Sequence, residues 1–232
     1  MRLLVSQPDH EAGLEQLRNE LKGHHLFFDA LLYPEGYVLG DSGVHNLCEL
    51  AKQYKKLIVT GYRDRNNKDR ALIVNAEGEI IFERTKSPMN GGLYTPSSVA
   101  VYSRSIGYLL CVELLQGLVG LENEIALAGK FTFIAHPIGV GMFSDEQFAE
   151  WIAEATKIAL KYNTMIIGTS HADGSYRNCG VSLPISYWID SEGQPVYISR
   201  NDTRSRILNL ETRQFTILDD FCKDDIRLSG SV

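Results

Sequence analysis

Short apolar segments alternate with longer segments of helical periodicity along the chain. Runs rich in Val, Ile, Phe and Tyr are typical of buried strands, and apolar residues spaced three and four apart are typical of helices that cover a sheet. The helices predicted from this spacing are 10–21, 44–54, 114–128 and 144–161. The predicted strands are 2–6, 27–33, 57–60, 71–75, 79–85, 99–102, 106–111, 131–136, 164–169 and 206–210, with a further hairpin over 181–199. The pattern predicts an α/β fold.

The order of the predicted elements is repeated within the chain. Strand, helix, strand, helix, strand and hairpin follow one another over residues 2–85, and roughly the same order returns over 107–199. Both hairpins turn at a Glu-Gly pair, at Gly78 and at Gly193, where glycine supplies the positive φ of a tight turn. Two similar halves favour an α-β-β-α sandwich of two mixed sheets flanked by helices. The alternative is ordinary α/β alternation without an internal repeat.

Composition and charge narrow the class of protein. Of the 232 residues, 44% are hydrophobic and 22% are charged, and no Ser/Gly/Pro-rich linker interrupts them, so we expect one domain over 1–232 with a polar tail over 219–232. The net charge is −6 and the basic residues are scattered, which argues against nucleic acid or a membrane surface as partner. No apolar run is long enough for a signal peptide or a membrane span, so we expect a cytoplasmic protein.

The cysteines and histidines do not predict a metal or cofactor site. Four widely spaced cysteines form neither a CxxC pair nor a disulfide framework. The histidines do not group with cysteines or carboxylates at the spacing of metal ligands. The segment Gly139-Val140-Gly141 lacks the third glycine and the later acid of a dinucleotide site. We therefore expect neither a metal nor a cofactor.

Three reactive side chains follow predicted strands at comparable places. Glu35 follows the strand 27–33, Lys86 follows the first hairpin, and Cys111 ends the strand 106–111 just before a helix. Functional residues of α/β sheets tend to lie at the carboxyl ends of strands. Taken one at a time, they are typical of a solvated turn, a charged edge and a buried packing residue.

These segments, in this order, resemble the nitrilase superfamily of carbon–nitrogen hydrolases. The resemblance covers most of the chain and includes Tyr33-Pro34-Glu35, Lys86, Cys111-Val112-Glu113 and the late segment Gly180-Val181-Ser182-Leu183-Pro184-Ile185. It implies an α-β-β-α fold, a Glu–Lys–Cys catalytic triad at Glu35, Lys86 and Cys111, and a homodimer. The breadth of amide chemistry in that family favours an amidase acting on a small-molecule amide over a true nitrilase.

The chemistry of these residue types fits that activity. The thiolate is the nucleophilic form of cysteine, and its pKa falls at a helix N-terminus or beside a cation. The helix expected from Leu114 and the ammonium of Lys86 predict a thiolate at Cys111 in the resting protein. Glu35 would act as general base and then as general acid, and the backbone N–H of Val112 would assist Lys86 in holding the oxyanion of a reaction through a thioester.

One departure from the family concerns the segment between the lysine and the cysteine. Many members carry a further Glu there that positions the substrate, whereas this chain has no Asp or Glu over 85–112. Asn90 or Tyr94 is the alternative polar contact. The departure motivates a second hypothesis, a catalytically silent relative that binds a metabolite or a protein. With the resemblance set aside, a third is an α/β binding domain in which Cys111 is part of the core.

Further candidates have supporting or substrate-binding roles. Glu113 lies where the family has an acid, and we expect it to hold neighbouring groups; the alternative is an acid that complements a helix dipole. His136, with 139–143 after it, and His171 follow predicted strands, and each is a substrate contact, a support or a satisfied loop residue. The apolar stripe of the helix 144–161 is typical of core or of a subunit interface.

Overall fold

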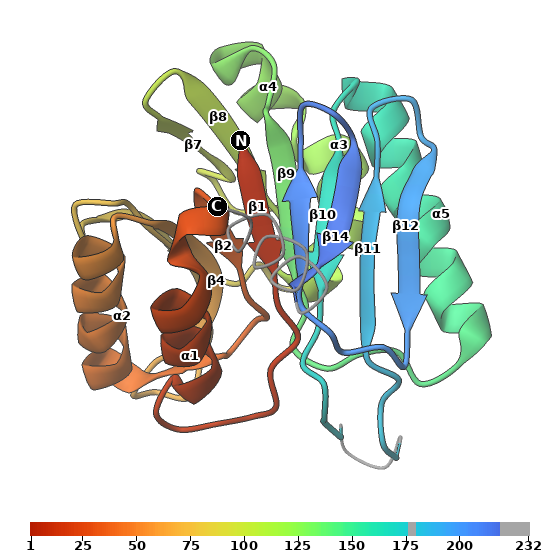
Figure 1. Cartoon of the computed structure of the whole chain (residues 1–232). Helices are drawn as coiled ribbons and strands as arrows, with labels where there is room; N and C mark the ends of the chain where they lie inside the picture. The colour runs from red at the N-terminus through yellow and green to blue at the C-terminus, as the bar shows by residue number, and fades with distance from the viewer. Residues whose placement is uncertain (176–179, 219–232) are drawn as a thin grey trace, which may run out of the picture.

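Four layers make up the structure, a computed structural model that describes residues 1–175 and 180–218. Helices α1 (Glu15–His24) and α2 (Gly40–Tyr54) cover one side, helix α5 (Asp145–Tyr162) covers the other, and two β-sheets lie between them (Figure 1). This is the predicted α-β-β-α sandwich. The predicted polar tail at 219–232 lies outside the described residues. Within the described residues, no helix combines the length and the apolar character needed to cross a membrane.

The first sheet joins the N-terminal half to the end of the described chain. Its strands are β1 (Arg2–Val5), β2 (Ala30–Leu32), β3 (Val38–Leu39), β4 (Leu57–Arg63), β5 (Asp69–Val74), β6 (Ile80–Thr85), β13 (Arg206–Asn209) and β14 (Gln214–Ile217). They follow the order β14-β13-β1-β2-β4-β5-β6, with β3 paired to β4. Strands β1, β2 and β4 are parallel, and β5 and β6 continue the sheet antiparallel as the predicted hairpin.

The second sheet repeats this arrangement. Its strands are β7 (Ser98–Val101), β8 (Arg104–Tyr108), β9 (Phe133–Pro137), β10 (Ile166–Thr169), β11 (Ile185–Ile189) and β12 (Pro195–Arg200). They follow the order β12-β11-β10-β9-β8-β7. Strands β8, β9 and β10 are parallel, and β11 and β12 form the antiparallel hairpin. The sequence repeat is therefore a repeat of strand pairing, which confirms that prediction.

Three apolar clusters hold the layers together. One lies between the sheets and includes Leu3, Phe133 and Trp188. The second joins α1 and α2 to the outer face of the first sheet. The third joins α5, through Trp151 and Ile158, to the outer face of the second sheet. The apolar stripe of α5 is thus core within one chain and leaves the predicted homodimer without that support, so the dimer stays a prediction.

Two predicted helices differ from the observed ones. Helix α1 begins at Glu15 instead of residue 10 because Leu14 has a left-handed backbone with φ of 61°, so His10 lies in a loop. The predicted helix 114–128 is two helices, α3 (Leu114–Gly120) and α4 (Glu122–Ala128). Glycine destabilises a helix by about 1 kcal/mol relative to alanine, and Gly120 stands at the break.

Candidate active site

Glu35, Lys86 and Cys111 come together from three strand ends. Glu35 follows β2 and Lys86 follows β6 in the first sheet, whereas Cys111 follows β8 in the second. Cys111 opens a short 3-10 turn, Cys111–Glu113, that leads directly into α3. Loops at the ends of both sheets therefore build one site.

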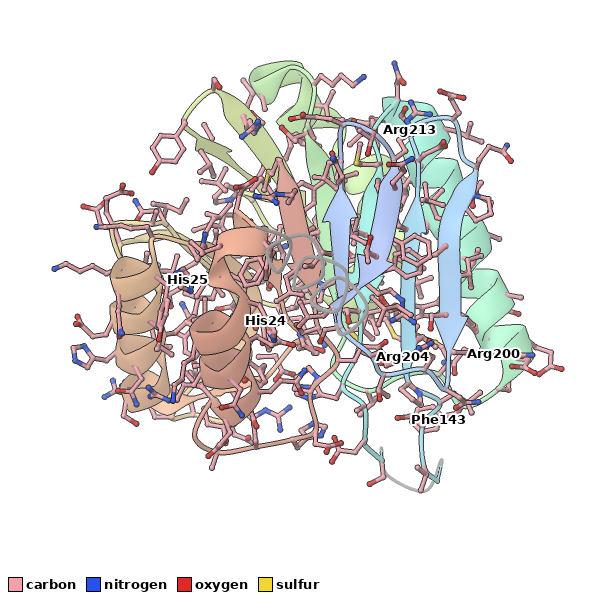
Figure 2. The ribbon with its side chains drawn as sticks, in the orientation of Figure 1. His24, His25, Phe143, Arg200, Arg204 and Arg213 are labelled. Atoms are coloured by element: carbon pink, nitrogen blue, oxygen red, sulfur yellow. The ribbon has the colours of Figure 1, made fainter. Side chains whose placement is uncertain are left out.

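A cavity of about 640 Å³ opens where these side chains meet. Its polar lining includes His10, Arg63, Asp69 and Gln147 besides Glu35, Lys86 and Cys111. Its apolar lining includes Leu39, Met89, Val112, Val140, Met142, Phe143 and Trp151. The segment 139–143 lines the cavity as predicted. Figure 2 shows Phe143 at the end of the second sheet where Arg200 pairs with Asp145 at the start of α5.

The carboxylate of Glu35 lies beside both of the other polar groups. The ammonium Nζ of Lys86 lies 2.6 Å from Oε1 of Glu35, and the Glu35 side chain is only 5% exposed. The sulfur of Cys111 is within hydrogen-bonding reach of the Glu35 carboxylate and of the backbone N–H of Gly139. The arrangement places an acid–base group and a cation beside a thiol.

Burial controls the protonation of this cluster. Burial raises the pKa of Cys111 to about 12, and the charge of Glu35 adds to the shift, which outweighs the opposing effects of Lys86 and the Gly139 N–H. Burial also raises the pKa of Glu35, although Lys86 opposes it. For Lys86, burial disfavours the charge, but Cys111 and Glu35 outweigh it and raise the pKa. Cys111 is therefore a neutral thiol at pH 7, which corrects the expectation of a resting thiolate.

The backbone of Cys111 is strained. Its φ is 53°, in the left-handed region, which costs a residue with a side chain on the order of 1–3 kcal/mol. Its carbonyl accepts hydrogen bonds from the backbone N–H of Leu114 and, at 2.9 Å, from Nε2 of His136. Such strain persists only where surrounding contacts hold it, and it is concentrated at functional sites.

Glu113 lies beneath the site and lines no part of the cavity. Its carboxylate accepts two hydrogen bonds from Arg84, both at 2.7 Å, and others from the backbone N–H groups of Ser87 and Leu110. Burial opposes its charge, but the Arg84 contacts outweigh burial and lower the pKa of Glu113. Glu113 thus ties the segment after Lys86 to the segment before Cys111, and a supporting role stays a prediction.

The other predicted candidates lie outside the cavity lining, apart from Val112. Asn90 is exposed and borders a separate groove. His136 and His171 are buried and bond to backbone carbonyls. The arrangement therefore gives no support to a direct substrate contact by these three side chains.

Sequence reasoning missed Asp69, which lines the cavity from the first position of β5. Its charge contributes to the raised pKa of both Glu35 and Lys86, and its Oδ1 accepts a hydrogen bond from Arg63. It provides an acid near Lys86 that the segment 85–112 lacks. The predicted hairpin could have indicated Asp69, because the pairing of its two strands, continued past their ends, brings Asp69 beside Lys86. The backbone N–H of Lys86 donates a hydrogen bond to the carbonyl of Asp69.

One group of possible metal ligands borders the cavity among the described residues. Ligand atoms of His10, His171 and Asp173 lie within 4.8 Å of one another. The two imidazole rings stack at 3.8 Å and are nearly parallel, so one ion cannot lie in the planes of both rings. Nδ1 of His10 is also paired with Asp173 at 2.7 Å. We assign no metal to this group.

Comparisons with known proteins identify the fold. No family model and no curated protein matches the sequence. A carbon–nitrogen hydrolase from Helicobacter pylori G27 is similar in structure, with a TM-score of 0.73 and 14% identity over 92% of this chain and 90% of that chain. So is a glutamate variant of the amidase from Nesterenkonia sp. AN1 that shows Michael addition of acrylamide at its active-site cysteine, with a TM-score of 0.71 and 13% identity over 97% of this chain and 99% of that chain.

A third similar structure belongs to the nitrilase superfamily. It is a cysteine-to-alanine variant of the Nesterenkonia AN1 amidase, with a TM-score of 0.72 and 14% identity over 97% of this chain and 93% of that chain. At these identities the likeness establishes the architecture. The chain therefore has the fold of the carbon–nitrogen hydrolases of the nitrilase superfamily.

Proposed function

We propose that this protein hydrolyses a non-peptide C–N bond of a small amide, with Glu35, Lys86 and Cys111 as its catalytic groups. The observation that carries the proposal is the contact of one carboxylate, one ammonium and one thiol at the same cavity. The adduct at the active-site cysteine of an amidase with the same fold supports it.

In the first step, the sulfur of Cys111 attacks the carbonyl carbon of the amide. Because the resting group is a thiol, the Glu35 carboxylate accepts its proton as the S–C bond forms. The π electrons of the carbonyl move to its oxygen, and the Lys86 ammonium and the backbone N–H of Val112 stabilise that oxyanion.

In the second step, the C–N bond breaks and leaves a thioester. Glu35, now a carboxylic acid, gives its proton to the departing nitrogen, so ammonia or an amine leaves in neutral form. Water then attacks the thioester carbonyl while Glu35 accepts its proton, and that proton returns to the sulfur as the carboxylic acid is released. Because burial raises the pKa of Glu35, its carboxylate is a stronger base than an exposed one, which assists its protonation by the thiol and by water.

Ammonia release from a panel of small amides tests the proposal. We expect Cys111→Ala, Glu35→Gln and Lys86→Met each to lower the rate by about 10³-fold or more, because such groups act as a unit. Cys48→Ala is the matched control, since Cys48 lies in α2 outside the cavity lining, and it should retain full activity. Amide binding without ammonia release by the unaltered chain would instead support a catalytically silent binding protein and refute hydrolysis.

A further inference from the structure

Two buried histidines lie near the carboxyl ends of two neighbouring strands. His136 lies in β9, and His171 follows β10 directly beyond Ser170. The two strands are parallel and paired, with His136 opposite Gly168 (Figure 1). Each side chain is at most 1% exposed.

His136 holds the backbone of Cys111. Its Nε2 lies 2.9 Å from the carbonyl oxygen of Cys111, and its Nδ1 lies 2.5 Å from the hydroxyl of Tyr187. A carbonyl can only accept, so Nε2 carries the proton and Nδ1 accepts from Tyr187. Burial lowers the pKa of His136 to about 4, which keeps the ring in this neutral form at pH 7. The ring thus braces the residue whose left-handed backbone needs support.

His171 contacts the backbone of Glu35, although its Nδ1, unlike that of His136, has no hydrogen-bond partner among the described residues. Its Nε2 lies 3.1 Å from the carbonyl oxygen of Glu35. The ring of His10 stacks on it at 3.8 Å, and Asp173 fixes His10 in turn. Burial, with a further contribution from His10, lowers the pKa of His171 to about 4, so this ring is also neutral at pH 7.

We infer that His136 and His171 are paired positioning residues, each of which fixes the backbone of one catalytic residue from an adjacent strand of the second sheet. The inference rests on the proposed function. Glu35 belongs to a loop of the first sheet and Cys111 to a loop of the second, so their separation depends on the packing of two sheets. The hydrogen bonds from His136 and His171 attach both carbonyls to β9 and to the end of β10, which are paired in one rigid sheet.

The geometry of proton transfer explains why the backbones of Glu35 and Cys111 need to be fixed. Glu35 must remain within hydrogen-bonding reach of the Cys111 sulfur, and a displacement of about 1 Å in such a site costs on the order of 10²-fold in rate. Neither histidine lines the cavity, so each acts through the residue that it holds. Loss of the Nε2–H donor should therefore lower kcat and leave KM nearly unchanged.

Amide hydrolysis by donor-free and donor-retaining variants tests the inference. Methionine fills a similar space without a donor, whereas glutamine places an N–H near the position of Nε2. We expect His136→Met and His171→Met to lower kcat by about 10²-fold with KM within about twofold, and the Gln variants to recover most of the loss. His45→Met, at an exposed position of α2, should have no effect. Folded Met variants with normal kcat, a loss confined to KM, or Gln variants no better than Met would overturn the inference.

A second measurement needs no substrate. The ¹³C resonance of the Cys111 carbonyl should move upfield in His136→Met but not in His171→Met. The resonance of the Glu35 carbonyl should move upfield in His171→Met but not in His136→Met. If the unaltered protein hydrolyses no amide, the proposed function fails, and this crossed pattern still tests the anchoring. Carbonyl resonances of Cys111 and Glu35 that stay unchanged in both Met variants would refute the anchoring. Should His136→Met not fold, Tyr187→Phe removes only the hydroxyl that orients His136 and should move the same Cys111 resonance.

Discussion

The guanidinium of Arg84 faces the carboxylate of Glu113 in a two-point contact, with both N–O distances at 2.7 Å and both side chains buried. Arg84 ends the buried part of β6 just before Lys86, and Glu113 closes the turn that Cys111 opens. The pair therefore links the two segments that present the ammonium and the thiol. An ion pair removed from water in this way contributes chiefly by fixing geometry, because desolvation offsets much of its attraction.

Breaking this pair should be strongly destabilising. Glu113→Gln leaves the Arg84 charge buried without its counter-ion, and we expect a loss of about 3–5 kcal/mol in the free energy of unfolding. Urea unfolding measures it, with Glu150→Gln on the exposed face of α5 as control. A loss below about 1 kcal/mol, the value of a surface pair, would contradict the structural role of Glu113.

The two buried histidines should make stability fall in mild acid. Their pKa is about 4 in the folded protein and about 6.5 when unfolded, so below pH 6.5 the unfolded chain binds more protons and the free energy of unfolding decreases. Between pH 6.5 and 4.5 each histidine should remove roughly 2–3 kcal/mol. Glu35 acts in the opposite direction in this window, because its raised pKa favours the folded state as pH falls. Urea unfolding of the unaltered chain and of His136→Gln isolates one histidine, and equal pH slopes would contradict the prediction.

Two substitutions should move the pKa of Cys111 in opposite directions. Glu35→Gln removes a negative charge beside the sulfur and leaves Lys86, so the pKa should fall well below 12. Lys86→Met removes the cation and should raise it further. Titration of the thiolate by its ultraviolet absorbance measures both, in a background in which the other three cysteines, Cys48, Cys179 and Cys222, are replaced by alanine. Glu35→Gln would then carry more thiolate than the unaltered chain and still lose hydrolysis, and full activity in that variant would show that Glu35 is not the base.

We expect that glycine is needed at position 139 because a side chain there would crowd the carboxylate of Glu35. A Cβ at this position would lie 2.8 Å from Oε2 of Glu35, whose flexible end can move aside. Gly139→Ala should therefore fold normally, displace Glu35 and lower kcat by roughly 10–10²-fold. Gly23→Ala in α1 is the matched control, because a Cβ there meets nothing within 4 Å. A fully active Gly139→Ala variant would show that Glu35 does not have to sit at its observed place.

The layers of the fold are predicted well from the sequence because the strands and helices that form them depend on local hydrophobic patterning. The repeat of strand, helix and hairpin, together with the glycines at the hairpin turns, is sufficient to place β2, β6 and β8, whose ends carry Glu35, Lys86 and Cys111. Boundaries that depend on single backbone angles are harder. The start of α1 depends on the left-handed Leu14, which no hydrophobic pattern reveals.

The protonation of the site could not be predicted from residue types. A cation beside Cys111 suggested a thiolate, but the sulfur is buried and shares its surroundings with the Glu35 carboxylate, and these two effects prevail. The roles of His136 and His171 depend on contacts between distant segments, since Glu35 and His171 are far apart in the chain and meet only in the fold. Asp69 joins the cavity because β5 begins two residues before the predicted strand 71–75, at a position that the hydrophobic pattern does not mark as strand.

Trapping the acyl group on the protein tests directly whether Cys111 is the nucleophile of a hydrolysis through a thioester. The unaltered protein is mixed with an amide that it hydrolyses, quenched within the first turnover, digested and analysed by mass spectrometry. We expect the acyl mass on the peptide that contains Cys111, none on the peptide that contains Cys48, and no adduct or turnover in Cys111→Ala. Ammonia release by Cys111→Ala at the rate of the unaltered protein would contradict this expectation.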